Sequence, residues 1–237
     1  MARVSRIVET GLSGQRYAIT ICPSPASETT PMRQPRTVRA LEEFGRTRLS
    51  QSFFMRDFLY SEIAAINGLP NLPDDPDLAI AAGERLCEEL LEPLQSRFGR
   101  ISVRSAYRSS GVNAFGNANK LNCAINEKNF AGHIWDRRDA GGHMGATACI
   151  IVNRFISYYQ RSGDWEALAW WVHDKLPYSN MEFFPKFAAF NLQWHEVPTR
   201  SIHSFIPPRR GCLTKPGMAN WDGRHEDAYA AMLEEIG

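Results

Sequence analysis

Two histidines, two aspartates and a cysteine gather in one short stretch of the sequence, GHIWDRRDAGGHMGATAC (residues 132–149): His133, Asp136, Asp139, His143 and Cys149. Imidazole nitrogen, carboxylate oxygen and thiolate sulfur are the groups that bind zinc in proteins. A catalytic zinc takes three protein ligands and one water, whose pKa it lowers so that a nearby carboxylate can accept the proton. The stretch therefore predicts a metal-binding loop, with a hydrogen-bonded polar loop as the alternative.

A sixth candidate ligand lies further along the chain, in a segment with the pattern of a strand. In FNLQWHEV (residues 190–197), polar and apolar side chains alternate. Alternation with a period of two places them on opposite faces of a strand. His195 therefore falls on a polar face, together with Asn191 and Gln193, whereas Glu196 falls on the opposite face.

The elements that must position these residues follow one another without an internal repeat. Helices are predicted at 75–99, in the second half of 146–163 and at 165–176, and strands at 101–106, 190–197 and 201–206. Asp75 and Pro76 fit the start of the first helix, which Pro93 should kink and Gly99 end. Residues 111–142 show no regular period and are predicted to form a long loop. This order indicates an α+β fold in which 201–206 pairs with 190–197.

Two of the arginines in RISVRSAYRSS (residues 100–110) lie in and after the strand predicted at 101–106. Arg104 lies within this strand, and Arg108 lies just beyond its end. The two arginines therefore need not act together.

The order of these pieces resembles the D-alanyl-D-alanine carboxypeptidase family over about residues 53–206. The matching segments are ELLEPLQSRFG, ISVRSAYRSSGVN, GATAC and WHEV. The resemblance implies a hedgehog-type α+β fold with a small antiparallel sheet and flanking helices. It also implies zinc-dependent cleavage of peptidoglycan cross-bridge peptides, an activity common among phage lytic enzymes. SAYRSSGVN is similar to the family's S-G-Y-R-S-x-x-x-N, which implies that Arg108 holds the substrate or transition state, supported by Ser109 and Asn113.

The resemblance also implies a ligand set. The family's motif H-x-x-G-x-A-x-D is followed downstream by a third histidine, which His195 matches. His133 and Asp139 are the first choices for the other two ligands, and the alternatives are His143, Asp136 and Cys149. The family's catalytic carboxylate is absent, because Leu192 and Gln193 stand at its position. Glu182 is the predicted substitute, and zinc is the predicted cofactor.

Composition and charge limit the classes of partner. The net charge of +1 argues against sequence-specific nucleic-acid binding, and no run approaches the roughly 20 apolar residues of a membrane span. The start MARVSRIVETGL lacks the apolar core of a secretion signal. The five cysteines include no C-x-x-C pair. We expect reduced thiols in a protein made in the cytoplasm.

Three regions are predicted: an extended basic arm (1–50), a peptidase-like domain (51–206) and a C-terminal extension packed on it (207–237). The arm holds eight arginines against four glutamates. It could bind another subunit, giving a homo- or hetero-oligomer.

Three functions fit these residues. The first is a phage-encoded zinc peptidase acting on peptidoglycan. The second is a catalytically inactive protein of the same fold that binds other phage structural proteins and is incorporated in a virion, a hypothesis that the arm and the extension favour. The third, a cysteine-dependent hydrolase, has no local sequence signature.

Overall fold

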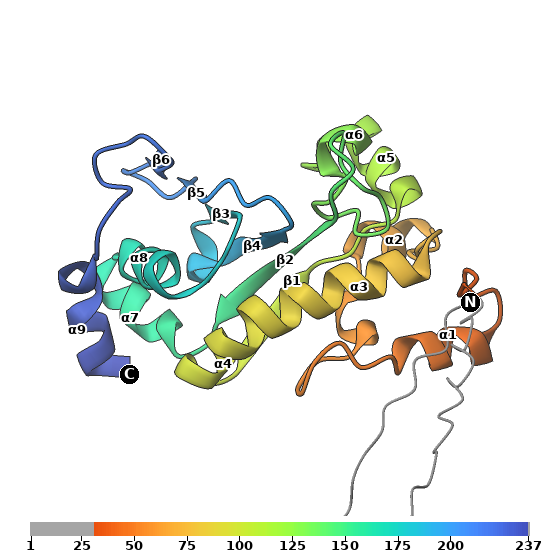
Figure 1. The fold of residues 1–237 in the computed structure, drawn as a ribbon, viewed down its shortest axis with the longest axis horizontal. Coiled ribbons are helices and arrows are strands. Elements are labelled where there is room, and N and C mark those ends of the chain that lie inside the picture. The colour runs from red at the N-terminus through yellow and green to blue at the C-terminus, as the bar shows by residue number, and fades with distance from the viewer. Residues whose placement is uncertain (1–30, 237) are drawn as a thin grey trace, which may run out of the picture. The chain divides into compact units, whose positions relative to one another are not determined.

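Six strands form one sheet in residues 31–236, which are the residues that the computed structural model describes (Figure 1). They follow the order β1-β2-β4-β3-β5-β6, and all neighbours are antiparallel except the parallel pair β3–β5. The strands are β1 (Ile101–Ser105), β2 (Gly145–Val152), β3 (Asn180–Phe183), β4 (Phe190–His195), β5 (Ser201–Ser204) and β6 (Gly211–Thr214). A mostly antiparallel sheet with separate helices is an α+β architecture, which confirms the predicted class at that level.

Helices precede, interrupt and follow the strands. Within the described residues they are α1 (Val38–Gly45), α2 (Glu62–Asn67), α3 (Pro76–Leu86), α4 (Glu92–Phe98), α5 (Ser110–Ala118), α6 (Asn126–Asn129), α7 (Phe155–Ser162), α8 (Glu166–Lys175) and α9 (Glu226–Ile236). Two short 3-10 turns, η1 (Met55–Phe58) and η3 (Lys186–Ala188), and one π-helical turn, η2 (Cys87–Leu91), complete the set. No helix of this part of the chain is long and apolar enough to cross a membrane.

The predicted helix at 75–99 is formed by α3, η2 and α4 in succession, and it crosses the sheet in Figure 1. It begins where Asp75 Oδ1 accepts the N–H of Leu78 at 3.1 Å, and Pro76 occupies its first turn. The π-helical turn lies immediately before Pro93, which has no N–H to donate to the preceding turn. Beside the position of the predicted kink, the hydrogen bonding of the helix therefore changes from the α type to the π type, in which Glu92 N–H donates to Cys87 O.

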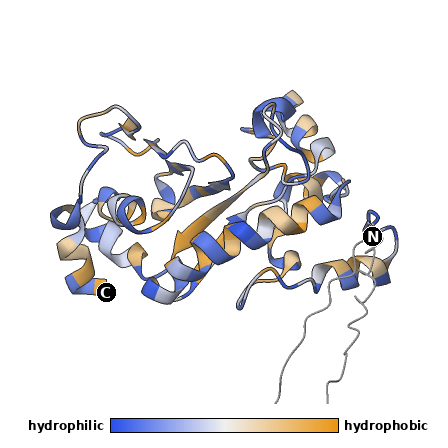
Figure 2. Cartoon of the chain, viewed as in Figure 1, coloured by the Kyte–Doolittle hydropathy of each residue, from blue (hydrophilic) through white to orange (hydrophobic). Residues whose placement is uncertain are grey.

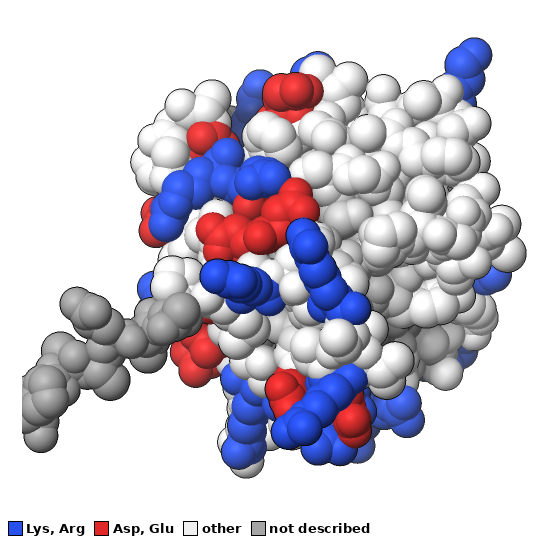
Figure 3. Space-filling view, turned by 90° about the vertical axis from the view of Figure 1, so that its right-hand side faces the viewer, with Lys and Arg blue, Asp and Glu red and all other residues white. Residues whose placement is uncertain are grey.

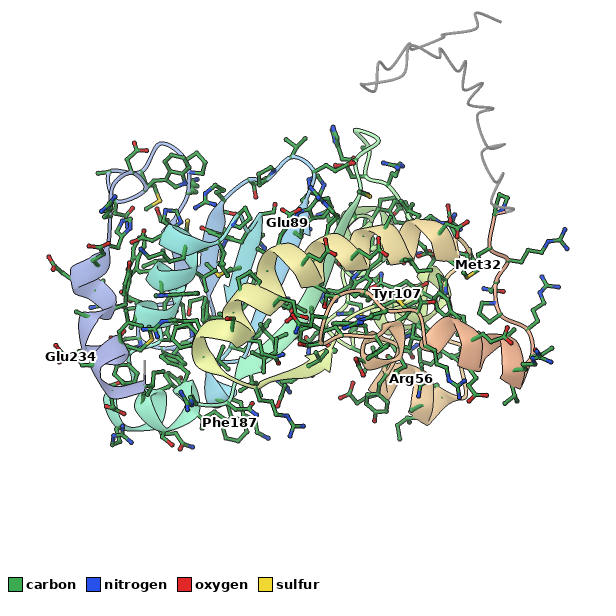
Figure 4. All side chains as sticks on the ribbon, turned by 60° about the horizontal axis from the view of Figure 1, so that its bottom comes forward. Met32, Arg56, Glu89, Tyr107, Phe187 and Glu234 are labelled. Carbon is green, nitrogen blue, oxygen red and sulfur yellow. The ribbon has the colours of Figure 1, made fainter. Side chains whose placement is uncertain are left out.

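One face of the sheet packs against this long helix. All eight residues of β2 are buried, and Figure 2 shows this strand as hydrophobic along most of its length. Trp194 of β4 donates from Nε1 to Glu89 Oε2 at 2.9 Å, and the guanidinium of Arg85 lies over its ring. Figure 4 labels Glu89 on the long helix. The apolar side chains of the alternating strands therefore face the helix, as the sequence pattern predicts.

The opposite side is named the polar face here. It is formed by the alternate residues Thr147 and Cys149 of β2, Asn191, Gln193 and His195 of β4, Asn180 and Glu182 of β3, and Ser201 and His203 of β5. In β3, β4 and β5 these residues are half-buried, while their neighbours along each strand are buried. The predicted positions of Asn191, Gln193 and His195 on one polar face are confirmed.

The predicted arm differs from the structure in its last part. Residues from Met32 onward belong to one compact unit, and Phe44 and Leu49 are buried in its core. Thr37 Oγ1 caps α1 by accepting the N–H of Ala40 at 3.1 Å. Residues 32–50 of the predicted arm therefore belong to this unit, because apolar side chains among them join its core despite the Pro-rich context. Residues 1–30 of the predicted arm lie outside the described residues.

Two other local predictions are wrong. The predicted loop at 111–142 contains α5 and α6, whose low intrinsic helix propensity hides them in the sequence. α5 is stabilised by its Ser109 cap and by the burial of Val112, Asn113 and Gly116. The strand at 201–206 pairs with β3 and β6 and not with β4, because β3 occupies the position beside β4.

The C-terminal helix α9 is attached to α8 through a buried carboxylate. Asp174 Oδ1 lies 2.8 Å from His225 Nδ1, and Asp174 Oδ2 accepts the His225 N–H at 2.8 Å and the Tyr229 hydroxyl at 3.2 Å. The other ring nitrogen of His225 lies 3.0 Å from Asn220 O, and the ring stacks on Trp170. These bonds hold the extension to the domain.

Candidate functional site

Chemically active side chains form one continuous row across the polar face, which is named the central row here. Strand pairing places Ser105, Cys149, Asn191, Glu182, His203 and Cys212 side by side, one from each strand. Asn191 Nδ2 donates to Glu182 Oε2 at 2.9 Å. The β1 end of this row, around Cys149, is where the other candidate residues approach from the helices and loops.

Arg108 follows β1 and is held at this end by several hydrogen bonds. Its backbone N–H donates to His133 O at 2.8 Å, and its Nη1 donates to Cys123 Sγ at 2.9 Å and to Asn113 Oδ1 at 3.4 Å. Asn71 fixes the two flanking residues by donating to Tyr107 O and accepting from Ser109 N–H. The guanidinium therefore has a defined position.

Arg108 is half-buried, yet it has no acidic partner in the described part of the chain. No Asp or Glu oxygen there lies within 4.0 Å of its guanidinium, whereas many other arginines form such pairs. The side-chain groups to which it donates, an amide oxygen and a thiol, are neutral. A partly desolvated guanidinium without a counterion provides a binding position for an anion.

His133 lies beside Arg108 and is buried. Its Nδ1 donates to Ala106 O, 2.7 Å away, which leaves Nε2 as the acceptor nitrogen facing the side chain of Asn191. Burial, and next the positive charge of Arg108, lower the pKa of His133 from 6.5 to about 3. The imidazole is therefore neutral at physiological pH.

Cys149 is the buried centre of this group. Burial raises the pKa of its thiol to about 11, although the charges of Arg104 and Arg108 act in the opposite direction. The thiol is protonated at neutral pH, and a thiol is a much weaker nucleophile than a thiolate. This geometry gives no support to a cysteine-dependent hydrolase.

A second group lies at the end of β4, around His195. Asp139 Oδ2 is 3.2 Å from His195 Nε2, and Asp139 Oδ1 is 3.4 Å from His143 Nδ1. The backbone N–H groups of His143 and Gly141 donate to Asp139 Oδ1, and the bond from His143 is the main reason that the pKa of this carboxyl is lowered. The second ring nitrogen of His195 lies within 3.0 Å of the Val197 N–H.

The structure separates the three predicted zinc ligands between these two groups. His133 faces Asn191, whereas Asp139 contacts His195, four residues further along β4. Four strand residues span about 13 Å. His133 therefore lies in one group, and Asp139 and His195 lie in the other.

The other predicted site residues are distributed as follows. Cys149 and Glu182 lie in the central row, on either side of Asn191, which His133 faces. His143 lies with Asp139 and His195. Glu182 is therefore not placed to take a proton at His195. Asp136 belongs to neither group, since it is buried and accepts the N–H of Asp74 at 2.7 Å.

These side chains do not fit the zinc site that the family resemblance implies. Among residues 31–236, no three histidine, cysteine, aspartate or glutamate side chains are arranged to hold a metal ion. In the His195 group, Asp139 Oδ1 already accepts two backbone N–H groups. As placed, Asp139 lies between the two imidazole rings and is held by backbone N–H groups.

Sequence reasoning missed two members of the Arg108 group. Asn191 was visible only as one polar position of an alternating strand, and its contact with Glu182 depends on how β3 and β4 pair. Cys123 lies in the segment predicted as a loop, and no sequence signal links it to Arg108. Asn113, in contrast, follows from the match of SAYRSSGVN.

The fold and this site define an α+β protein in which an arginine at a polar sheet face has no acidic partner among residues 31–236. Acidic and basic side chains are interspersed on the face shown in Figure 3. Comparisons with protein-family models, curated proteins and solved structures give no match for this chain.

Proposed function

We propose that this chain is a peptide-binding protein that holds a peptide carboxylate at Arg108 on the polar face. The observation that carries the proposal is the half-buried guanidinium of Arg108, which has no acidic partner among residues 31–236 and is fixed by Asn113 and Cys123. Guanidinium and carboxylate groups form paired, charge-assisted hydrogen bonds. A peptide C-terminus supplies that carboxylate.

The neighbours of Arg108 suit the remainder of such a ligand. His133 is neutral, with an acceptor nitrogen toward the polar face, and Asn191 offers an amide beside it. Neither side chain carries a negative charge. Glu182, held by Asn191, bounds the region on the β3 side with a negative charge. A ligand carboxylate is therefore drawn toward the β1 end of the central row.

This proposal corresponds to the catalytically inactive form of the peptidase-like architecture. The predicted ligand trio is divided, so no metal-dependent step is assigned to these residues. The family resemblance suggests peptidoglycan peptides as ligands, and incorporation in a phage particle stays a prediction from the sequence.

Calorimetric titration with Ala-Ala-Ala and with its C-terminal amide tests the proposal. The wild-type chain should bind the free acid about 10- to 100-fold more tightly than the amide, since a hydrogen bond to a charged group contributes about 1.5–3 kcal/mol. Arg108→Gln should remove this preference. The matched control Arg210→Gln, which changes an exposed arginine also without an acidic partner among the described residues, should retain it.

The wild-type comparison does not depend on the folding of any variant. Equal affinity for the acid and the amide, or no binding of either, would overturn the proposal. A preference that survives in a folded Arg108→Gln variant would place the carboxylate elsewhere.

A zinc peptidase is the second candidate, and one observation favours it. Asp139 lies near both His143 and His195, and aspartate and histidine both bind zinc. Elemental analysis of chain purified without chelator separates the two proposals. Near-stoichiometric zinc that is lost in His195→Ala would favour the peptidase, and metal-free chain after incubation with zinc would eliminate it.

A further inference from the structure

Strand β1 contains an irregularity that changes the position of Arg104. Val103 pairs with Ile150 and Ser105 pairs with Cys149, so the pairing with β2 skips one residue of β1. Arg104 is the extra residue of a β-bulge, in which two residues of one strand oppose one residue of the other. Arg104 and Ser105 together therefore oppose Cys149, a member of the polar face.

Regular alternation would place Arg104 on the face opposite to Ser105, whereas in the bulge both residues oppose Cys149. The positive charges of both arginines act on the Cys149 thiol, which lies between β1 and β4. Arg104 is exposed, and no Asp or Glu oxygen of residues 31–236 lies within 4.0 Å of it. Within the described residues, two guanidinium groups without acidic partners therefore act on one position of the sheet.

The negative charge nearest to them in the central row lies on the opposite side. Glu182 is separated from Cys149 by Asn191, and two strand spacings correspond to about 10 Å. Glu62 of α2 also acts on the Cys149 thiol, but its effect is smaller than that of Glu182. A second anionic group on a ligand held at Arg108 would be repelled by Glu182 and attracted by Arg104. The charges thus specify a direction, away from β3 and toward β1.

We infer that the preferred ligand is a peptide whose C-terminal residue carries a second carboxylate, with Arg108 binding one carboxylate and Arg104 the other. This inference rests on the proposed function, because it requires a peptide carboxylate at Arg108. Arg104 acts as a specificity-determining residue. It distinguishes a C-terminal glutamate from the isosteric, uncharged glutamine.

Competition between two peptides, Ala-Ala-Glu and Ala-Ala-Gln, tests this directly by calorimetric titration. Wild-type chain should bind the glutamate peptide about fivefold more tightly, a value typical of a solvent-exposed ion pair. The preference should weaken between 20 and 200 mM salt, because the interaction with exposed Arg104 is screened. Arg104→Gln should reduce the ratio to about one and leave the affinity for Ala-Ala-Gln unchanged.

The matched control is Arg210→Gln, which removes the same charge from an exposed position and should keep the fivefold ratio. If wild-type chain binds both peptides equally, or if Arg104→Gln keeps the ratio, the inference is overturned while the peptide-binding proposal stands. If neither peptide binds, both are overturned.

Discussion

Acid should destabilise this protein through His133, and replacing that residue should remove a defined part of the effect. In the folded chain His133 is buried beside Arg108, and its pKa is about 3. In the unfolded chain its pKa returns to 6.5. The unfolded state therefore binds the extra proton, so the stability from a neutral His133 is present above pH 6.5 and is lost as pH falls toward 3.

The magnitude follows from the two pKa values. At pH 5 the imidazole is almost fully protonated in the unfolded chain and almost fully neutral in the folded one. Proton uptake on unfolding then lowers the unfolding free energy by about 2 kcal/mol relative to pH 7.5. This figure depends mainly on the unfolded value, because at pH 5 a folded pKa anywhere below about 4 leaves His133 neutral.

His133→Asn is the suitable perturbation, since an amide nitrogen can still donate to Ala106 O as Nδ1 does. Urea unfolding at pH 7.5 and pH 5 should show a decline that is about 2 kcal/mol smaller in the variant than in wild type. His203→Asn, on a half-buried strand position of the same face, should keep the wild-type decline. Parallel pH profiles of wild type and His133→Asn would refute the reasoning.

Two further perturbations concern packing and the C-terminal helix. Gly145→Ala would place a Cβ against Ala131 O, so we expect the free energy of unfolding, measured with urea, to fall by at least about 2 kcal/mol. The control Gly111→Ala, in open space on α5, should be neutral or slightly stabilising. Equal effects of the two substitutions would contradict this expectation. Asp174→Asn should lower the hydrogen-exchange protection of α9 by removing the carboxylate that His225 contacts, while β2 stays protected; unchanged exchange in α9 would argue that other contacts hold the helix.

The parts of the fold that could be predicted are those whose signal is local. The alternation in FNLQWHEV is a property of one strand and correctly gave β4 and its polar face. The cap at Asp75, the proline at 76 and the glycine at 99 likewise gave the long helix. These patterns are reliable because the residues that form the pattern also form the local hydrogen bonds and packing of the same strand or helix.

The parts that could not be predicted depend on pairing between distant segments. Whether His133 meets Asn191 or His195 depends on the register of β2 against β4 and on the path of the loop before it, which the sequence does not encode locally. The bulge at Arg104 is invisible for the same reason, since one extra residue reverses the face on which a side chain lies. Helix α5 was not predicted, because its residues have a weak helix propensity and the helix is stabilised by burial against other segments.

The bulge in β1 has a consequence for the behaviour of the protein in concentrated solution. β1 is the edge strand at one end of the sheet, and an edge offers free backbone groups to which a strand of another molecule can add. A bulge twists such an edge, and a charged side chain on it must lose water when a second strand approaches. Arg104 sits in that bulge, so the same residue that selects an acidic ligand also protects the sheet against edge-to-edge aggregation.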